Sequence, residues 1–318
     1  DRIAEIVGGA LRGRKPIAVG NPVFNYDKAL PRKLSTPRYT AYIKIAEGCD
    51  NACTFCSIPM MRGAFRSRSI ESIVAEAEQL AAQGVKEVSL IAQDSTNYGS
   101  DLYGSFMLPA LLDRVSRVEG IEWVRLHYAY PGYFTDELIE TIASNPKICK
   151  YIDMPLQHSE DRILRRMRRP GRGRDVKELV AKIRAAIPDA VLRTSIIVGF
   201  PGETDEDFER LIEFVKEMKF DRLGVFAYSQ EEDTPAARLP DQVPEDVKEY
   251  RASRLMEVQR EVARVANGRF VGKILDVLIE RYDGRNDVYV GRSQYDAPEI
   301  DGEVFVTGCS PEIGQLQK

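Results

Sequence analysis

A chain of 318 residues with 43% apolar and 30% charged residues is long enough for one large core plus a small satellite, or for two modest domains. No stretch approaches the roughly 18 apolar residues that a membrane-spanning helix needs, and the first residues, DRIAEIVGGALRGRK, lack the layout of a secretory signal. The sequence therefore argues against a membrane partner and predicts a cytoplasmic protein, while the net charge of -4 neither implies nor excludes a nucleic-acid partner.

The first part of the chain, residues 1–36, lacks the pattern of the part that follows. It contains a short helix-like piece and then an extended stretch interrupted by prolines, NPVFNYDKALPRKLSTPR. We interpret residues 1–36 as the tail of a preceding domain with its linker.

Residues 37–235 alternate short apolar runs with amphipathic helical stretches. We expect one helix between Ser69, which is placed to cap it, and Gly84, and another after Thr204 and Asp207, which have capping-box spacing. Such repeats predict parallel strands with right-handed crossovers, in an open doubly wound sheet or in a barrel. The six expected strands are Tyr42–Ala46, Glu87–Ala92, Trp123–Tyr128, Tyr151–Pro155, Leu192–Val198 and Leu223–Tyr228.

The last part of the chain changes character twice. Residues 236–268 form a connector and one long helix, expected over Glu245–Ala266. Residues 269–318 contain the alternating runs KILDVLIE, VYVGRS and EVFVTG, separated by Gly and Asp turns, which predict a small antiparallel β-domain. This β-domain is expected to stop a strand or two early.

Three of the five cysteines, Cys49, Cys53 and Cys56, lie within eight residues in the segment EGCDNACTFCSIP. This grouping indicates ligation rather than a disulfide framework. Three thiolates on a 4Fe-4S cubane leave one iron open, and that iron can take the amino and carboxylate groups of S-adenosylmethionine. The alternative is a structural zinc site, which needs a fourth ligand from Cys149, Cys309 or one of the two histidines.

The C-x3-C-x2-C spacing, with aromatic Phe55 before the third cysteine, resembles the radical S-adenosylmethionine superfamily. The resemblance implies an α/β fold, a partial (β/α)6 barrel with the cluster after the first strand, and a Phe55 side chain that approaches the adenine ring. The order of linker, cluster motif, GFPGET string, long helix and terminal β-domain resembles the methylthiotransferases, whose last domain is called TRAM. A TRAM-like β-barrel is therefore expected at the end of the chain.

Two branches of that family compete: the RimO type modifies an aspartate of the twelfth small-subunit ribosomal protein at its β-carbon, and the MiaB type modifies adenosine in tRNA. The strings at Gln93–Gly99, Arg125–Pro131 and Pro155–His158 are similar to the ribosomal-protein branch. The tRNA branch has Gly-Gln-Asn where this chain has Ala92-Gln93-Asp94. We therefore expect a basic ribosomal protein as the substrate.

The distribution of charge tests this expectation independently. Residues 270–318 contain five Lys or Arg and nine Asp or Glu, whereas a domain that grips tRNA should be basic. An acidic face suits a basic ribosomal protein, although these charges could also merely solvate the β-domain. Residues 158–184 differ, with ten Lys or Arg against four acids, and either contact ribosomal RNA or form a solvated helix face.

The resemblance implies that an electron from the cluster cleaves S-adenosylmethionine, and that the 5'-deoxyadenosyl radical abstracts hydrogen from the aspartate. Sulfur then reaches that carbon through a second 4Fe-4S cluster, which the family binds with three cysteines in an N-terminal domain. We interpret this sequence as a fragment without that domain, so it is expected to bind one cluster and to cleave the cofactor uncoupled from sulfur insertion. A reducing electron donor is also implied.

The candidate cofactor-binding residues beyond the cysteines are Gln93, Asp94, Gln157 and Arg193, besides Phe55. Gln93 and Asp94 occupy the place of the loop that holds the amino group of the cofactor in the superfamily, and Gln157 and Arg193 lie at strand ends. Arg193 could pair with the methionine carboxylate or form a structural ion pair. Cys149 and Cys309 are both predicted to be buried as small apolar side chains. A rival hypothesis is an RNA-binding module with a structural cluster.

Overall fold

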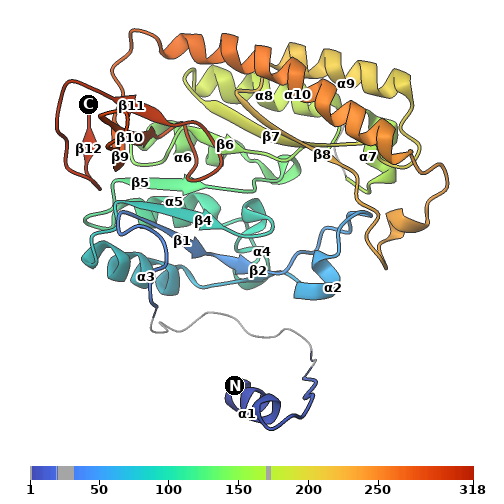
Figure 1. Cartoon of the computed structure of the whole chain (residues 1–318), viewed down its shortest axis with the longest axis horizontal. Coiled ribbons are helices and arrows are strands. Elements are labelled where there is room, and N and C mark those ends of the chain that lie inside the picture. The colour runs from blue at the N-terminus through green and yellow to red at the C-terminus, as the bar shows by residue number, and fades with distance from the viewer. Residues whose placement is uncertain (1, 19, 21–31, 170–172) are drawn as a thin grey trace.

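The computed structural model describes residues 2–18, 20, 32–169 and 173–318. Its centre is a curved sheet of six parallel strands, with helices on the outer side (Figure 1). Each strand comes from a short run of β-branched and apolar residues, and its boundaries lie close to those expected from the sequence. The strands are β1 (Thr40–Lys44), β4 (Glu87–Ile91), β5 (Trp123–Leu126), β6 (Tyr151–Asp153), β7 (Val191–Val198) and β8 (Arg222–Ala227).

The order of the strands in space follows their order in the chain. Strands β1, β4 and β5 pair in parallel, as do β6, β7 and β8. Backbone hydrogen bonds join the two halves, from Val124 N to Lys147 O at 2.8 Å and from Cys149 N to Val124 O at 3.0 Å. A doubly wound sheet would reverse the order at a switch point. The alternative left open by the sequence is thus resolved, and the predicted partial (β/α)6 barrel is confirmed.

The strands expected at Trp123–Tyr128 and Tyr151–Pro155 each end two residues early, close to points where the backbone turns into the site. The expected strand Trp123–Tyr128 ends at Leu126, and Tyr128 has φ 60°. The expected strand Tyr151–Pro155 ends at Asp153, and Gln157 has φ 75°. A positive φ is uncommon for residues with a side chain, and it stops regular strand pairing.

The helices begin at the caps that the sequence predicts. The side chain of Ser69 accepts a hydrogen bond from Ser72 N, and Thr204 and Asp207 form a capping box. The outer helices are α3 (Ile70–Ala82), α5 (Leu108–Ser116), α6 (Asp136–Ser144), α7 (Asp161–Arg166), α8 (Gly173–Ala186) and α9 (Asp205–Met218). Short elements carry the loops: β2 (Ala46–Glu47), β3 (Arg66–Ser67), α2 (Ile58–Arg62), α4 (Ser100–Tyr103) and the 3-10 turns Ser95–Asn97, Pro131–Tyr133, Pro235–Arg238 and Gly268–Phe270.

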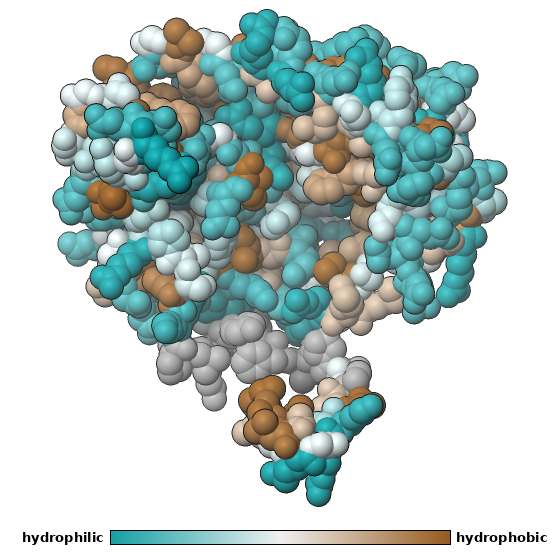
Figure 2. Space-filling model, in the orientation of Figure 1, coloured by the Kyte–Doolittle hydropathy of each residue, from teal (hydrophilic) through white to brown (hydrophobic). Residues whose placement is uncertain are grey.

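One large apolar core lies between the sheet and the helices. Ile43, Leu90 and Ile196 from the strands are fully buried against helix residues such as Leu211. Burying a side chain of this size stabilises the fold by roughly 2 kcal/mol. No described residue before Leu34 contributes to this core, and helix α1 (Ile3–Leu11) leaves apolar side chains exposed at the foot of Figure 2.

The last part of the chain forms a long helix and a small sheet. Helix α10 (Glu245–Asn267) packs against β8 and α9. The sheet is antiparallel with the order β11-β10-β9-β12, and its register shifts at Gly291, where a Cβ would lie 2.3 Å from Leu278 O. The strands are β9 (Val277–Asp283), β10 (Val288–Ser293), β11 (Val304–Val306) and β12 (Leu316–Gln317).

Buried ion pairs join this β-domain to the base of the barrel, where the strands begin. Glu87, fully buried at the start of β4, binds Arg125 of β5 at 2.7 Å and Arg292 of β10 at 2.6 Å. Burial alone would raise the pKa of Glu87, but the two guanidinium groups outweigh it and hold that pKa at about 2. The carboxylate is therefore charged, and it links two domains.

Other polar contacts extend the same interface. The Tyr151 hydroxyl donates to Asp301 at 2.6 Å, and Arg222 binds Asp296 at 2.7 Å. Cys149 is buried here, and burial raises its pKa to about 11. The β-domain therefore covers the end of the barrel opposite to the carboxyl ends of the strands (Figure 1).

Candidate functional site

A cavity of about 650 Å³ lies at the carboxyl ends of the barrel strands. Its wall is built from the segments that follow all six strands, which is where a parallel barrel gathers its functional groups. The lining residues are Cys49, Asn51, Cys53, Phe55, Cys56, Ile58, Ala92, Gln93, Asp94, Tyr128, Ala129, Tyr130, Pro155, Gln157, Arg169, Ser195, Ile197, Phe226, Ala227, Tyr228, Ser229 and Glu231.

The three clustered cysteines all line this cavity. Cys53 is buried, whereas Cys49 and Cys56 are partly exposed. Burial raises the pKa of both Cys49 and Cys53. Thiols in this state remain protonated until a metal centre binds the sulfur and displaces the proton. The arrangement therefore suits metal ligation.

The loop that carries the cysteines is fastened to three other segments. Gly48 has φ 79°, and a Cβ there would lie 2.2 Å from Ala64 O, so the loop entry requires glycine. The Thr54 hydroxyl donates to Arg166 O at 2.9 Å, and Thr54 N donates to Met167 O at 3.0 Å. Ala236 N donates to Thr54 O at 2.9 Å. The sulfurs therefore lie on a fixed backbone rather than on a free loop.

Gln93 and Asp94 enter the cavity after β4 and differ in their hydrogen bonding. Asp94 is 3% exposed and accepts hydrogen bonds from Asn51 at 2.8 Å and from Thr96 at 2.7 Å. Burial raises the pKa of Asp94, against the effect of these hydrogen bonds. Gln93 Oε1 is buried and has no hydrogen-bond partner within the described chain. Asp94 thus holds the loop, while Gln93 leaves a buried acceptor unpaired in the cavity wall of the described chain.

Gln157 and Arg193 have different positions relative to the cavity. Gln157 lines it, and its backbone is fixed to β7 by hydrogen bonds from Gln157 N to Ser195 O at 2.9 Å and from Ile197 N to Gln157 O at 2.8 Å. Arg193 is absent from the lining residues in the described chain and binds Asp153 at 2.7 Å. Of the two alternatives given for Arg193, the structure thus shows a structural ion pair.

Sequence reasoning missed several residues that line the cavity, notably Arg169, Tyr130 and Glu231. Arg169 follows α7 and was treated only as part of the basic segment 158–184. Its head group lies 4.3 Å from the centre of the Tyr130 ring. No spacing rule connects these residues to the cysteines. Arg169 lies two residues after Met167, and no pattern in the sequence alone marks it as a cavity residue.

Among the residues that the structure describes, no fourth ligand for a zinc ion lies at the cysteine loop. Cys149 is buried at the base of the barrel, and Cys309 is exposed, so the prediction that Cys309 is buried is wrong. His127 faces Asp153 and His158 faces Glu203, each at 3.5 Å. Within the described ranges, no three His, Cys, Asp or Glu side chains converge as ligands of one metal ion do. Thiolates on a cubane bind different irons and need not converge on one point.

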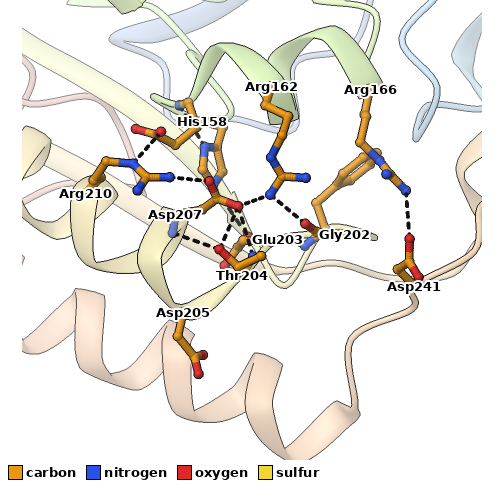
Figure 3. Close-up of polar contacts among 12 residues, drawn as sticks. His158, Arg162, Arg166, Gly202, Glu203, Thr204, Asp205, Asp207, Arg210 and Asp241 are labelled. Atoms are coloured by element: carbon orange, nitrogen blue, oxygen red, sulfur yellow. Dashed lines mark hydrogen bonds and ion pairs between the residues drawn. The ribbon is translucent and has the colours of Figure 1, made fainter.

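Several side chains of the basic segment pair with acidic side chains of the same chain. Figure 3 shows Arg162 and Arg210 on either side of Asp207, with Arg166 directed toward Asp241. The Arg210–Asp207 pair spans 2.6 Å. Asp207 also belongs to the capping box of α9 and is 1% exposed.

The same pattern continues along α8. Lys177 binds Glu217 at 2.6 Å, Lys182 binds Asp136, and Arg184 donates to Met218 O at 2.7 Å. Side chains that already have partners in the chain offer less charge to phosphates. Both alternatives for residues 158–184, contact with ribosomal RNA and a solvated helix face, stay predictions.

The GFPGET string forms a strand-to-helix turn outside the cavity. Glu203 accepts hydrogen bonds from Gly199 N at 2.8 Å and from Arg251 of α10 at 3.0 Å. Gly199 has φ 70°, and a Cβ there would lie 2.3 Å from the Lys248 side chain. The turn therefore attaches α10 to the barrel.

The fold and the thiol-lined cavity define a class of protein, and comparison with known families agrees. The family described as the Radical SAM superfamily matches residues 43–215, and the TRAM domain family matches residues 271–318. The fold is shared with the radical S-adenosylmethionine methyltransferase TsrM from Kitasatospora setae, at a TM-score of 0.52 and 19% identity over 69% of this chain and 42% of that one. It is also shared with coproporphyrinogen III oxidase from Escherichia coli, at a TM-score of 0.52 and 16% identity over 74% and 55%.

Closer similarity is found among curated relatives. A ribosomal protein uS12 methylthiotransferase RimO from Desulforamulus reducens is 51% identical over 99% of this chain and 72% of its own length. A protein of the same name from Desulfitobacterium hafniense is 53% identical over 94% and 67%. The chain belongs to the radical SAM methylthiotransferases of the RimO family. No helix in the described ranges is long and apolar enough to cross a bilayer.

Proposed function

We propose that this chain supplies the radical-generating barrel of an enzyme that adds a methylthio group to the β-carbon of an aspartate in ribosomal protein uS12. One observation carries the proposal: Cys49, Cys53 and Cys56 line a single cavity, which also contains residues from the carboxyl ends of all six strands. A cytoplasmic location follows from a ribosomal-protein substrate.

The residues present fit a 4Fe-4S cluster with one open iron and a bound S-adenosylmethionine. Three thiols are available, the fourth ligand of a closed site is missing from the described surroundings, and the cavity contains the buried acceptor Gln93 Oε1. The cluster, when bound, supplies the electron that breaks the S–C5' bond of the cofactor. The other two cysteines lie apart, so we assign one cluster to these residues and expect the second in the N-terminal domain of the family.

The remaining cavity residues orient the cofactor in this proposal. Gln93 Oε1 accepts a hydrogen bond from the amino group of S-adenosylmethionine, and Asp94 fixes the Gln93 loop through Asn51 and Thr96. Gln157 and Phe55 line the same cavity, and in this assignment they would contact the ribose and the adenine of the cofactor. Arg193 has no part in this assignment, since Asp153 already binds it.

The choice of uS12 as substrate depends on the relatives of that name and on charge. The β-domain is acidic in sequence, which suits a basic ribosomal protein. Part of that charge is used internally, because Asp296 binds Arg222 and Asp301 binds Tyr151 at the base of the barrel. Modification of tRNA remains the alternative reaction, and a non-catalytic RNA-binding module is the alternative class.

Cofactor cleavage is tested with the anaerobically reconstituted chain, dithionite as the electron donor, and S-adenosylmethionine. We expect 5'-deoxyadenosine, measured by chromatography, from the parent chain and from Cys309→Ala, because Cys309 is exposed and outside the cavity. Cys53→Ala should lower the yield by more than 100-fold. A parent chain that binds its cluster and forms no 5'-deoxyadenosine would support the binding-module alternative.

The substrate is tested in a strain that lacks the gene. Mass spectrometry of uS12 should show loss of the methylthio group, and nucleoside analysis of tRNA should be unchanged. The reverse pattern would assign the enzyme to the tRNA branch.

A further inference from the structure

Arg169 joins three parts of the cavity wall. Its Nη2 donates to Pro155 O at 2.5 Å, after β6, and its head group stacks on the Tyr130 ring, after β5. Its Nη1 lies 3.9 Å from Cys53 Sγ, within hydrogen-bonding range for sulfur. One guanidinium therefore contacts the cysteine loop and the ends of two neighbouring strands.

The position of this positive charge is determined by the fold. Residues just before it in the chain are tied to the cysteine loop, through the hydrogen bonds from Thr54 to Arg166 O and Met167 O. Arginine stays charged under all relevant conditions, and its planar group can stack and donate simultaneously.

We propose that Arg169 is a positioning residue that raises the reduction potential of the cluster through the Cys53 sulfur. The proposal rests on the proposed function, because it requires the cysteines to bind a 4Fe-4S cluster. Reduction adds one electron, taken from dithionite, and makes the centre more negative. A cation that donates a hydrogen bond to a ligand sulfur stabilises that reduced form, since hydrogen bonds to the sulfurs and net charge are what set cluster potentials.

Two acidic side chains, Asp94 and Glu231, also line the cavity. Both are present in the parent chain and in variants at position 169, so a difference in potential between them reports the guanidinium that contacts Cys53 Sγ. Within the described chain, Arg169 is the one cationic side chain among the lining residues.

The experiment is a redox titration of the reconstituted cluster without S-adenosylmethionine, followed by electron paramagnetic resonance. Arg169→Gln removes the charge and Arg169→Lys keeps it. We expect the ratio of reduced to oxidised cluster at a fixed potential to fall about tenfold in Arg169→Gln, the effect of losing one charge-assisted hydrogen bond. Arg169→Lys should retain most of the parent ratio. The matched control is Arg165→Gln, since Arg165 is exposed on α7, donates to Asp161 O, and is not among the lining residues in the described chain.

Iron and sulfide content and the melting temperature separate this role from a structural one. An Arg169 side chain that only braces the wall would give Arg169→Gln a lower melting temperature or cluster content but an unchanged potential, and this result would overturn the inference. A shift of the same size in Arg165→Gln would also overturn it, because the effect would then be general rather than local. A parent chain that assembles no cluster would contradict the proposed function itself.

Discussion

At the base of the barrel, where the strands begin, oppositely charged side chains are paired: Glu87 is held between Arg125 and Arg292, and Arg222 binds Asp296. At the mouth, where the strands end, the cavity contains three thiols and the unsatisfied Gln93 Oε1. A fold tolerates unmatched buried polar groups only where something else compensates them. The ion pairs at the base hold two domains together, whereas the mouth has an unpaired acceptor and three thiols available for ligands.

The largest effect on stability is expected from removing the carboxylate that is shared by two arginines at the base of the barrel. Glu87→Ala leaves Arg125 and Arg292 buried without their shared carboxylate, so the free energy of unfolding should fall by about 3–5 kcal/mol. Urea denaturation measures it. The control is Glu303→Ala, because the Arg281–Glu303 pair is half exposed and should matter by less than about 1 kcal/mol. Equal losses in both variants would show that the base has no special role.

Low pH should weaken the ion pairs of Glu87, at the base of the barrel, over a defined range. The pKa of Glu87 is about 2 in the folded chain and 4.5 unfolded, so its contribution is complete above pH 4.5 and is lost as the pH falls toward 2. The amount is about 3 kcal/mol. We expect the difference in unfolding free energy between the parent chain and Glu87→Gln to shrink over this range. A difference that stays constant with pH would contradict the charged state of Glu87.

At the mouth, Gln93→Ala removes the unsatisfied acceptor. The KM for S-adenosylmethionine in 5'-deoxyadenosine formation should rise about tenfold, while the melting temperature stays close to that of the parent, because no internal hydrogen bond is lost. Gln83→Ala is the control, since Gln83 is exposed, donates to Gln79 O, and is not among the lining residues in the described chain. An unchanged KM with a lower melting temperature would make Gln93 a structural residue.

The smallest effect is expected on the outer surface. Lys182→Ala removes an exposed pair with Asp136 and should change the free energy of unfolding by less than about 1 kcal/mol. Cofactor cleavage should be unaffected, because α8 is remote from the cavity lining. A large loss of unfolding free energy or of cofactor cleavage would contradict the interpretation of this part of segment 158–184 as a solvated helix face.

The sequence was sufficient for the features that depend on local patterns. Apolar periodicity predicted the strands and helices, and the caps at Ser69 and Thr204 fell where expected. The cysteine spacing predicted a site after the first strand, and Gln93, Asp94 and Gln157 line the same cavity as the cysteines. These residues were predictable because parallel strands bring their carboxyl ends together.

The features that escaped prediction depend on contacts between residues far apart in the chain. Arg169 and Cys53 are separated by 116 positions, and Glu87 and Arg292 by 205. Whether Arg193 faces a ligand or Asp153 is decided by strand neighbours, and whether Cys309 is buried is decided by how the β-domain folds. Charge counts also mislead, because paired and buried side chains such as Asp296 add to the total without adding to the surface.

The most direct test of the account is Mössbauer spectroscopy of the reconstituted chain before and after addition of S-adenosylmethionine. We predict that one iron of the four changes its signal on addition and that Cys53→Ala abolishes the cluster. A centre whose four irons all remain unchanged, or a lone zinc ion, would contradict the claim that the mouth of the barrel holds a cluster open to the cofactor.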